Sequence, residues 1–259
     1  MSTRNEAFAP GTPCWSDATA DDLDGAIAFY SGLFGWTVER GPAELGGYSN
    51  ASLDGKLVAA LTAKFDANLP SVWTTYLATA DAAKTCAAIE THGGTVLSPP
   101  MAVMAFGTMA IATDPAGAVF GLWEAGTHTG YQRYNEPGSI TWNEVFVTDM
   151  EVGKRFYSSV FGHTFTDIDG PVAYASTEID GNTVGGIGEI GAGFRSDMQP
   201  GWNNYFSVTS ADDAVGRITE LGGTIVRGPD DTPFGRMALV TDNQGAYFSV
   251  HQAPDVPSS

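Results

Sequence analysis

Two stretches of this sequence occur twice, in the same order and at nearly the same separation. FYSGLFGW at Phe29–Trp36 returns 127 residues later as FYSSVFGH at Phe156–His163. FGTMAIATDPAGAVF at Phe106–Phe120 returns 128 residues later as FGRMALVTDNQGAYF at Phe234–Phe248. Repetition at a fixed offset indicates duplicated structural units, and half of 259 residues is an ordinary domain size. We therefore expect two copies of one domain, with any site within or between them.

Charge and composition narrow the classes of protein to which the chain belongs. It has 12 Lys+Arg against 30 Asp+Glu, a formal net charge of −18 and a pI near 4.3. An acidic surface repels phosphate and anionic lipid, so we expect neither nucleic acid nor a membrane as a partner. The two cysteines form no metal or redox motif, and no apolar run has the length of a signal peptide or membrane span. These features predict a cytoplasmic protein, monomer or homodimer, whose partner is a small molecule.

Hydrophobic spacing predicts the series strand, helix and three strands, twice in each half of the chain. Polar and apolar residues alternate over Pro13–Thr19, as in a strand, and apolar residues then recur at helical spacing from Leu23 to Phe34. Asp54-Gly55 and Asp180-Gly181 are strong signals for hairpin turns between strands. The sequence therefore predicts an α+β fold made of four βαβββ units.

A polar stretch rich in glycine and proline, Gly126–Ser139, separates the two copies. We therefore predict domain 1 at residues 1–127, a linker at residues 128–139 and domain 2 at residues 140–259.

Three motifs make the sequence similar to a known superfamily over nearly its whole length. They are the helix motif D-x-x-x-A-x-x-F-Y-x-x-x-F-G from Asp22 to Gly35, the Gly-Gly helix stop at Gly93-Gly94, and the D-P-x-G hairpin from Asp114 to Gly117. On these motifs the chain resembles the vicinal oxygen chelate superfamily of glyoxalase I, bleomycin-resistance proteins and extradiol dioxygenases. It is most similar to two-domain glyoxalase-like proteins, some of which are labelled hydroxylases. The resemblance implies two tandem domains whose βαβββ units curl in pairs into open, cup-shaped mixed sheets.

The resemblance also implies a divalent metal held by four ligands, commonly two His or Gln and two Glu. Carried over to this sequence, the ligand positions fall on Trp15, Ala60, Thr74 and Gly121 in the first copy, and on Trp142, Gly186, Asn203 and Ser249 in the second. Side chains of Trp, Ala and Gly do not ligate metals, and Thr, Ser and Asn seldom hold a transition metal unaided. We therefore expect no metal and no cofactor in either copy.

Aromatic side chains stand where the family has metal ligands. Trp15 and Trp142 occupy equivalent places, each two residues before an acid, Asp17 or Glu144. Because strand residues two apart share a face, each Trp and its acid should both line the cup. The other ligand-binding candidates are Trp73, Trp202, Tyr76, Tyr205, Trp123, His251 and Asn203. Tyr48 and Tyr174 form a further symmetric pair, whereas we assign Phe106, Phe234, Met109 and Met237 to packing and Asn143 to a structural hydrogen bond on the helix side.

A mostly apolar concavity with a few polar groups is typical of small-molecule sites, and tryptophan suits planar ligands. The sequence therefore predicts a protein that binds a small planar aromatic molecule in an apolar cup. The alternative is an enzyme of the same superfamily, a lyase, hydroxylase or dioxygenase-like protein, that acts on an aromatic metabolite with Glu144 or Asp17 as acid or base. A metal-dependent glyoxalase or extradiol dioxygenase with relocated ligands is less favoured, and so is a purely structural or protein-interaction role. If one cup works alone, we expect the more polar one that contains Glu144. The ligand, and whether each cup forms within or between the domains, stay open.

Overall fold

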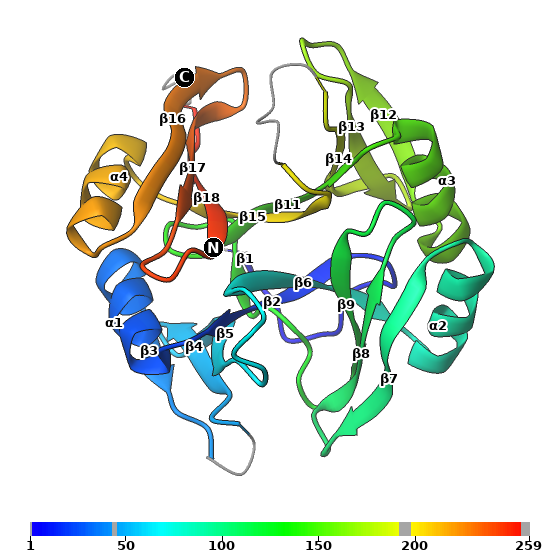
Figure 1. The fold of residues 1–259 in the computed structure, drawn as a ribbon, viewed down its shortest axis with the longest axis horizontal. Coiled ribbons are helices and arrows are strands. Elements are labelled where there is room, and N and C mark those ends of the chain that lie inside the picture. The colour runs from blue at the N-terminus through cyan, green and yellow to red at the C-terminus, as the bar shows by residue number, and fades with distance from the viewer. Residues whose placement is uncertain (1, 43–45, 192–197, 255–259) are drawn as a thin grey trace.

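The computed structural model describes residues 2–42, 46–191 and 198–254, which form two curled eight-stranded sheets, one two-stranded sheet and four helices (Figure 1). The elements of the first half are β2 (Pro13–Ala20), α1 (Leu23–Phe34), β3 (Thr37–Glu39), β4 (Ser49–Leu53), β5 (Lys56–Ala63), β6 (Val72–Thr79), α2 (Ala82–Thr91), β7 (Thr95–Val103), β8 (Gly107–Thr113) and β9 (Val119–Ala125). Those of the second half are β11 (Ile140–Val147), α3 (Met150–Phe161), β12 (Thr164–Ile168), β13 (Tyr174–Ile179), β14 (Asn182–Glu189), β15 (Gly201–Ser207), α4 (Ala211–Glu220), β16 (Thr224–Thr232), β17 (Gly235–Thr241) and β18 (Tyr247–Gln252).

Each half of the chain builds its own eight-stranded mixed sheet. The strand order is β3-β4-β5-β2-β6-β9-β8-β7 in the first sheet and β12-β13-β14-β11-β15-β18-β17-β16 in the second. The orders are equivalent, and in both the first strands of two consecutive βαβββ units lie side by side at the centre. The predicted fold class is confirmed, and each cup forms within one half of the chain.

The predicted hairpin turns have the backbone conformation that their sequences favour. Asp54 and Gly55 join β4 to β5 with φ of 48° and 71°, and Asp180 and Gly181 join β13 to β14 with φ of 50° and 74°. Positive φ at both central residues matches the right-handed twist of the flanking strands, and glycine and aspartate tolerate it better than most residues. These turns set the register of the middle strands and therefore which side chains reach the cups.

A short sheet forms inside the segment that we predicted as a linker. β10 (Arg133–Tyr134) pairs antiparallel with β1 (Ser2–Thr3). The preceding residues run along the first sheet, where the Tyr131 amide donates to the Cys14 carbonyl at 2.8 Å and the Gln132 amide donates to the Leu57 carbonyl at 2.8 Å. The linker is therefore packed against the first half of the chain.

Two sequence motifs identify the repeat, and hydrogen bonds join the first motif of each half to the second motif of the other half. The Tyr30 hydroxyl of α1 donates to Asp242 Oδ2 at 2.8 Å, and the Tyr157 hydroxyl of α3 donates to Asp114 Oδ2 at 3.1 Å. Each tyrosine belongs to the F-Y helix motif, and each aspartate belongs to the turn motif of the other half. Figure 1 accordingly shows α1 beside α4 and α2 beside α3. Each motif therefore contributes to the contact between the two halves.

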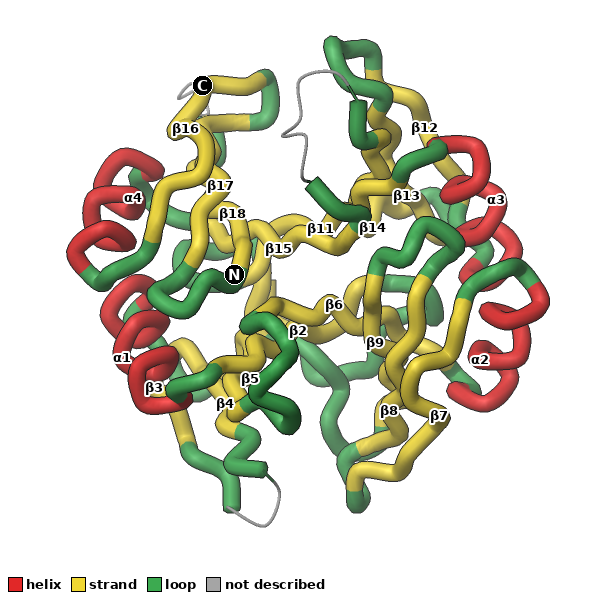
Figure 2. The backbone as a smooth tube through the Cα atoms, viewed as in Figure 1, coloured by secondary structure: helices red, strands yellow, loops and turns green. Residues whose placement is uncertain are grey.

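The two sheets meet at the centre of the molecule through a buried asparagine. Asn204 of β15 accepts hydrogen bonds at Oδ1 from Ser16 Oγ (2.5 Å), Thr75 Oγ1 (3.1 Å) and Asn143 Nδ2 (2.7 Å). The structural hydrogen bond predicted for Asn143 is thereby confirmed. Figure 2 shows the central strands of both sheets lying together, with the helices outside them. The longest helices have 12 residues, and none in the described part of the chain is long and apolar enough to cross a bilayer.

Candidate binding site

We define the first cup as the face of the first sheet that carries Trp15 and Asp17, and the second cup as the face of the second sheet that carries Trp142 and Glu144. Both eight-stranded sheets curl (Figure 1). In each cup the Trp and its acid come from the central strand, β2 or β11, so strand alternation places them together as predicted.

In the second cup, Glu144 is 5% exposed and is held by two tyrosines. The Tyr174 hydroxyl of β13 donates to Oε2 at 2.7 Å, and the Tyr205 hydroxyl of β15 donates to Oε1 at 2.5 Å. The Trp142 indole in turn donates to the Tyr174 hydroxyl at 3.0 Å. Both carboxylate oxygens are therefore engaged by side chains from neighbouring strands.

The first cup contains the same arrangement with a shorter acid. The Tyr48 hydroxyl donates to Asp17 Oδ2 at 3.1 Å, the Trp15 indole donates to the Tyr48 hydroxyl at 2.8 Å, and Tyr76 also hydrogen-bonds Asp17. A Trp, two tyrosines and an acid thus recur in both cups. The sequence named Tyr48 and Tyr174 as a symmetric candidate pair, but their bonds to the acids could not be predicted because the strand register was unknown.

Burial changes the acid–base properties of these groups. Loss of solvation raises the pKa of Asp17 to about 6, although hydrogen bonds from Tyr76 and Tyr48 oppose the change. Burial also raises the pKa of Glu144, again against the hydrogen bonds from its tyrosines. Desolvation and the neighbouring acid raise the pKa of Tyr174 and Tyr205, so both phenols are neutral hydrogen-bond donors near neutral pH.

Tyrosine side chains fill the space next to two positions at which the family has metal ligands. A Cβ added at Gly186 would lie 1.9 Å from the Tyr174 hydroxyl oxygen, and one added at Gly121 would lie 2.1 Å from Tyr76 Cδ1. A third ligand position, Ala60, pairs with Asp17 across β5 and β2, and an alanine side chain has no atom that can bind a metal. Within the described residues, no group of three or more His, Cys, Asp or Glu side chains comes together.

Two of the predicted ligand-binding residues lie on the other face of the sheets, so their placement in the cups is corrected. Trp73 donates to the Tyr30 hydroxyl at 2.8 Å, and Trp202 donates to the Tyr157 hydroxyl at 3.2 Å. Both indoles therefore point toward the helices. The reason is strand alternation, because each Trp lies three residues before the cup-facing Tyr76 or Tyr205, and an odd spacing reverses the face.

The remaining candidates do lie on the cup faces. Asn203 pairs with Glu144 across β15 and β11, and its Nδ2 donates to Ser249 Oγ at 2.9 Å. His251 pairs with Met237 across β18 and β17, and its Nε2 is 2.8 Å from the Phe234 carbonyl oxygen. Met237 was assigned to packing, and the pairing places it at the surface of the second cup.

At the equivalent place of the first cup, Trp123 donates to the His128 carbonyl at 2.8 Å. The imidazole of His128 packs against the Trp15 ring, with centroids 4.5 Å apart. Sequence analysis missed this residue, because the linker is not part of the repeat. The aromatic residues in an otherwise polar linker were the one available signal.

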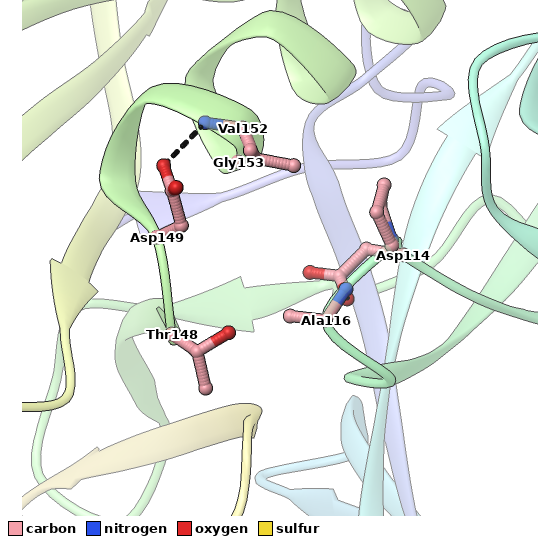
Figure 3. Close-up of a pocket in the computed structure, with 7 residues that line it drawn as sticks. Asp114, Ala116, Thr148, Asp149, Val152 and Gly153 are labelled. Atoms are coloured by element: carbon pink, nitrogen blue, oxygen red, sulfur yellow. Dashed lines mark hydrogen bonds between the residues drawn. The ribbon is translucent and has the colours of Figure 1, made fainter.

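Two cavities, of about 160 and 300 Å³, lie outside the cups along the boundary between α2 and α3. Figure 3 shows the smaller one, between Asp114 in the β8–β9 turn and Asp149 at the start of α3. Its carboxylates are engaged, since Asp114 Oδ1 accepts from the Ala116 amide and Asp149 Oδ1 caps the Val152 amide, both at 2.9 Å. We therefore treat this cavity as a packing feature of the interface.

Replacing Ala116 by glutamine is expected to fill the smaller cavity. At the equivalent α1–α4 boundary, Gln244 accepts from the Asp22 amide and donates to the Asp22 carbonyl, both at 2.7 Å. Ala116 occupies the equivalent turn position, and glutamine there should add up to about 1 kcal/mol to the free energy of unfolding. Thermal unfolding measures the effect, with Gln244→Ala expected to lower the midpoint. A lower midpoint in Ala116→Gln would contradict the equivalence of the two boundaries.

Comparisons with known proteins agree with this architecture. The sequence profile of the Glyoxalase/Bleomycin resistance protein/Dioxygenase superfamily matches residues 16–122 and 139–250. Anthracycline biosynthesis protein DauV of Streptomyces sp. (strain C5) is 38% identical, and DnrV of Streptomyces peucetius is 37% identical, each alignment covering 94% of both chains. The Mn(II)-bound glyoxalase from Novosphingobium aromaticivorans superposes with a TM-score of 0.65 at 17% identity, over 94% of this chain and 82% of that one. That structural likeness bears on the fold alone.

Proposed function

Because the chain belongs to the Glyoxalase/Bleomycin resistance protein/Dioxygenase superfamily, we propose that it uses the superfamily's cup without a metal, to bind a small planar aromatic molecule. The second cup is the proposed site. The observation that carries the proposal is the network of Trp142, Tyr174, Glu144 and Tyr205. It includes one of the ligand positions that the resemblance implies, Trp142, and lies beside two others, Gly186 and Asn203.

The donor atoms of the second cup do not fit a transition metal. Such metals take three or four nitrogen, sulfur or carboxylate ligands. The cup offers one carboxylate, Glu144, whose two oxygens already accept hydrogen bonds from neutral phenols, and one imidazole, His251, so the set falls short of three such ligands. The side chain of Tyr174 also leaves no room for a ligand at Gly186. We therefore derive no step of the function through a metal.

The surface of the second cup favours a flat, apolar ligand. Trp142, Tyr174 and Tyr205 are each partly exposed on this face, and Met237 and His251 are partly exposed beside them. Aromatic rings of this kind bind planar molecules over a large area and fix their orientation through edge-to-face or stacked contacts. The names of DauV and DnrV place those relatives in anthracycline biosynthesis, and anthracyclines are fused-ring aromatic compounds. A fused-ring aromatic molecule is therefore the proposed ligand class.

Binding is favoured over acid–base catalysis by the engagement of Glu144. A general base must reach the proton that it removes, and both oxygens of Glu144 are occupied by tyrosine hydroxyls. The acid therefore serves to hold Tyr174 and Tyr205 in place. Catalysis would be favoured over binding if the protein turned over an aromatic substrate and Glu144→Gln lost this turnover but still bound the substrate.

We expect 2-naphthol to bind to the protein and 2-decalol, its saturated and non-planar counterpart, to bind at least about tenfold more weakly. Removal of the indole in Trp142→Leu should weaken the binding of 2-naphthol by about tenfold or more, because the ring contact is lost. Isothermal titration calorimetry measures both effects. Phe65→Leu is the matched control, because Phe65 is 89% exposed on the loop after β5. Equal affinity for the two compounds, or an unchanged affinity in Trp142→Leu, would contradict the proposal.

A further inference from the structure

The first cup is filled by the chain's own linker. The ring of His128 lies edge-on to two indoles, with its centroid 4.5 Å from Trp15 at an interplanar angle of 83° and 5.5 Å from Trp123 at 82°. The Trp123 indole donates to the His128 carbonyl, and the Gly130 amide donates to His128 Nδ1 at 3.2 Å. Next to it, the Tyr131 ring lies 5.5 Å from the Trp15 ring. A planar ring thus occupies the first cup, held by aromatic contacts and hydrogen bonds.

This packing closes the first cup to other molecules. Trp15 is 3% exposed, whereas its counterpart Trp142 is partly exposed. Among residues 2–42, 46–191 and 198–254, Trp142 has a hydrogen-bonding partner in Tyr174 but makes no aromatic ring contact of the kind that His128 makes with Trp15. The two cups therefore share the same polar arrangement, and within the described residues they differ in whether an aromatic ring packs on the Trp.

Equivalent positions at the ends of β9 and β18 carry different hydrogen-bonding groups in the two cups. Trp123 presents an indole N–H, which meets a carbonyl oxygen. The equivalent residue in the second cup, 128 positions later, is His251. The first cup therefore has an indole at this position, which can only donate a hydrogen bond, whereas the second cup has the imidazole of His251, which can donate or accept.

The tautomer of His251 follows from its one hydrogen bond within the described residues. Its Nε2 lies 2.8 Å from the Phe234 carbonyl oxygen, which only accepts, so Nε2 carries the proton. In a neutral imidazole the other ring nitrogen, Nδ1, is then a hydrogen-bond acceptor. A ligand group that bonds to this nitrogen must be a donor, and on an aromatic ring the common donor is a hydroxyl.

We propose that the second cup takes one hydroxylated aromatic ring in the place that His128 takes in the first cup, edge-on to Trp142 and with its hydroxyl donating to His251 Nδ1. The protein then binds one ligand per chain, because the linker occupies the other cup. This inference rests on the proposed function and adds to it the ligand's functional group, its orientation and the stoichiometry.

The test compares 2-naphthol with 2-methoxynaphthalene, which has the same rings and no donor. Both compounds are titrated calorimetrically at about pH 8. We expect one equivalent of 2-naphthol per chain and about tenfold weaker binding of 2-methoxynaphthalene, the ratio that one hydrogen bond provides. In His251→Phe the two compounds should bind with equal affinity. His92→Phe, at an exposed histidine after α2, should keep the tenfold preference.

A second variant tests the role of the linker. His128→Gly removes the ring from the first cup, and a second equivalent of 2-naphthol or of imidazole should then bind. His128→Phe keeps a planar ring in place and should retain a stoichiometry of one. Circular dichroism spectra that match the wild type show that these variants fold, and the 2-naphthol comparison in His251→Phe does not depend on them.

The outcomes separate this inference from the proposed function. Equal binding of 2-naphthol and 2-methoxynaphthalene to the wild type would overturn the role of His251 and leave aromatic binding intact. Two equivalents of 2-naphthol in the wild type would overturn the closure of the first cup. Absence of binding by both compounds would overturn the proposed function itself and this inference with it.

Discussion

Replacing Asn204 by alanine is expected to lower the free energy of unfolding by about 3 kcal/mol, the largest effect of any substitution considered for this protein. The Asn204 side chain accepts hydrogen bonds from three buried donors, of which Ser16 and Thr75 belong to the other sheet. Alanine would remove the shared acceptor of these donors at a position that is 0% exposed, and each group left unpaired costs about 1–3 kcal/mol. Ser16 Oγ keeps its hydrogen bond with the Tyr131 hydroxyl at 2.5 Å, so the full cost does not apply to all three donors. The substitution therefore acts on the junction of the two halves.

Urea unfolding followed by far-ultraviolet circular dichroism measures this loss. Asn68→Ala is the matched control, because Asn68 is exposed on the loop between β5 and β6 and its substitution should change stability by less than about 0.5 kcal/mol. A loss of less than about 1 kcal/mol in Asn204→Ala would mean that the central hydrogen bonds do not hold the sheets together.

The second large effect concerns Asp17, whose substitution by asparagine should stabilise the protein near neutral pH. Burial raises the pKa of Asp17 to about 6 in the folded state, above the value of about 4 expected in the unfolded chain. Between these pH values the folded state binds more protons than the unfolded state, so wild-type stability falls as pH rises through the window. The difference of about two pKa units corresponds to at most about 3 kcal/mol.

Asparagine removes the ionisation and keeps an oxygen that accepts from Tyr48. The stability of Asp17→Asn relative to the wild type should therefore increase by about 2 kcal/mol between pH 4 and pH 7. Urea unfolding at several pH values in this range tests the prediction, and Asp169→Asn at an exposed position is the control. A stability difference that stays constant with pH would contradict a raised pKa at Asp17.

The fold could be predicted from sequence because its signals are local and duplicated. The repeat at Tyr30 and Tyr157 indicated two equivalent halves, and the Asp54-Gly55 turn indicated a hairpin that the structure contains. Alternation along the central strands correctly placed Trp15 beside Asp17 on one face. These inferences needed no knowledge of how distant parts of the chain meet.

The candidate site was predicted less completely because it depends on register and chain path. The prediction that Trp73 lines the cup relied on repeat symmetry alone. Strand alternation instead directs its side chain toward the helices, where it bonds to Tyr30. The bond between Tyr48 and Asp17 joins residues 31 positions apart, and the register that forms it is a tertiary property. His128 was missed because its contact with Trp15 depends on the path of a segment that lies outside the repeat.

The central claim is that the second cup binds an aromatic molecule without a metal, and one paired measurement tests it most directly. Protein purified without chelator or affinity tag is analysed for metal content and titrated calorimetrically with 2-naphthol, before and after treatment with EDTA. The proposed function predicts less than about a tenth of an equivalent of any transition metal and the same affinity in both titrations. About one or two equivalents of metal, with 2-naphthol binding lost after EDTA, would contradict it.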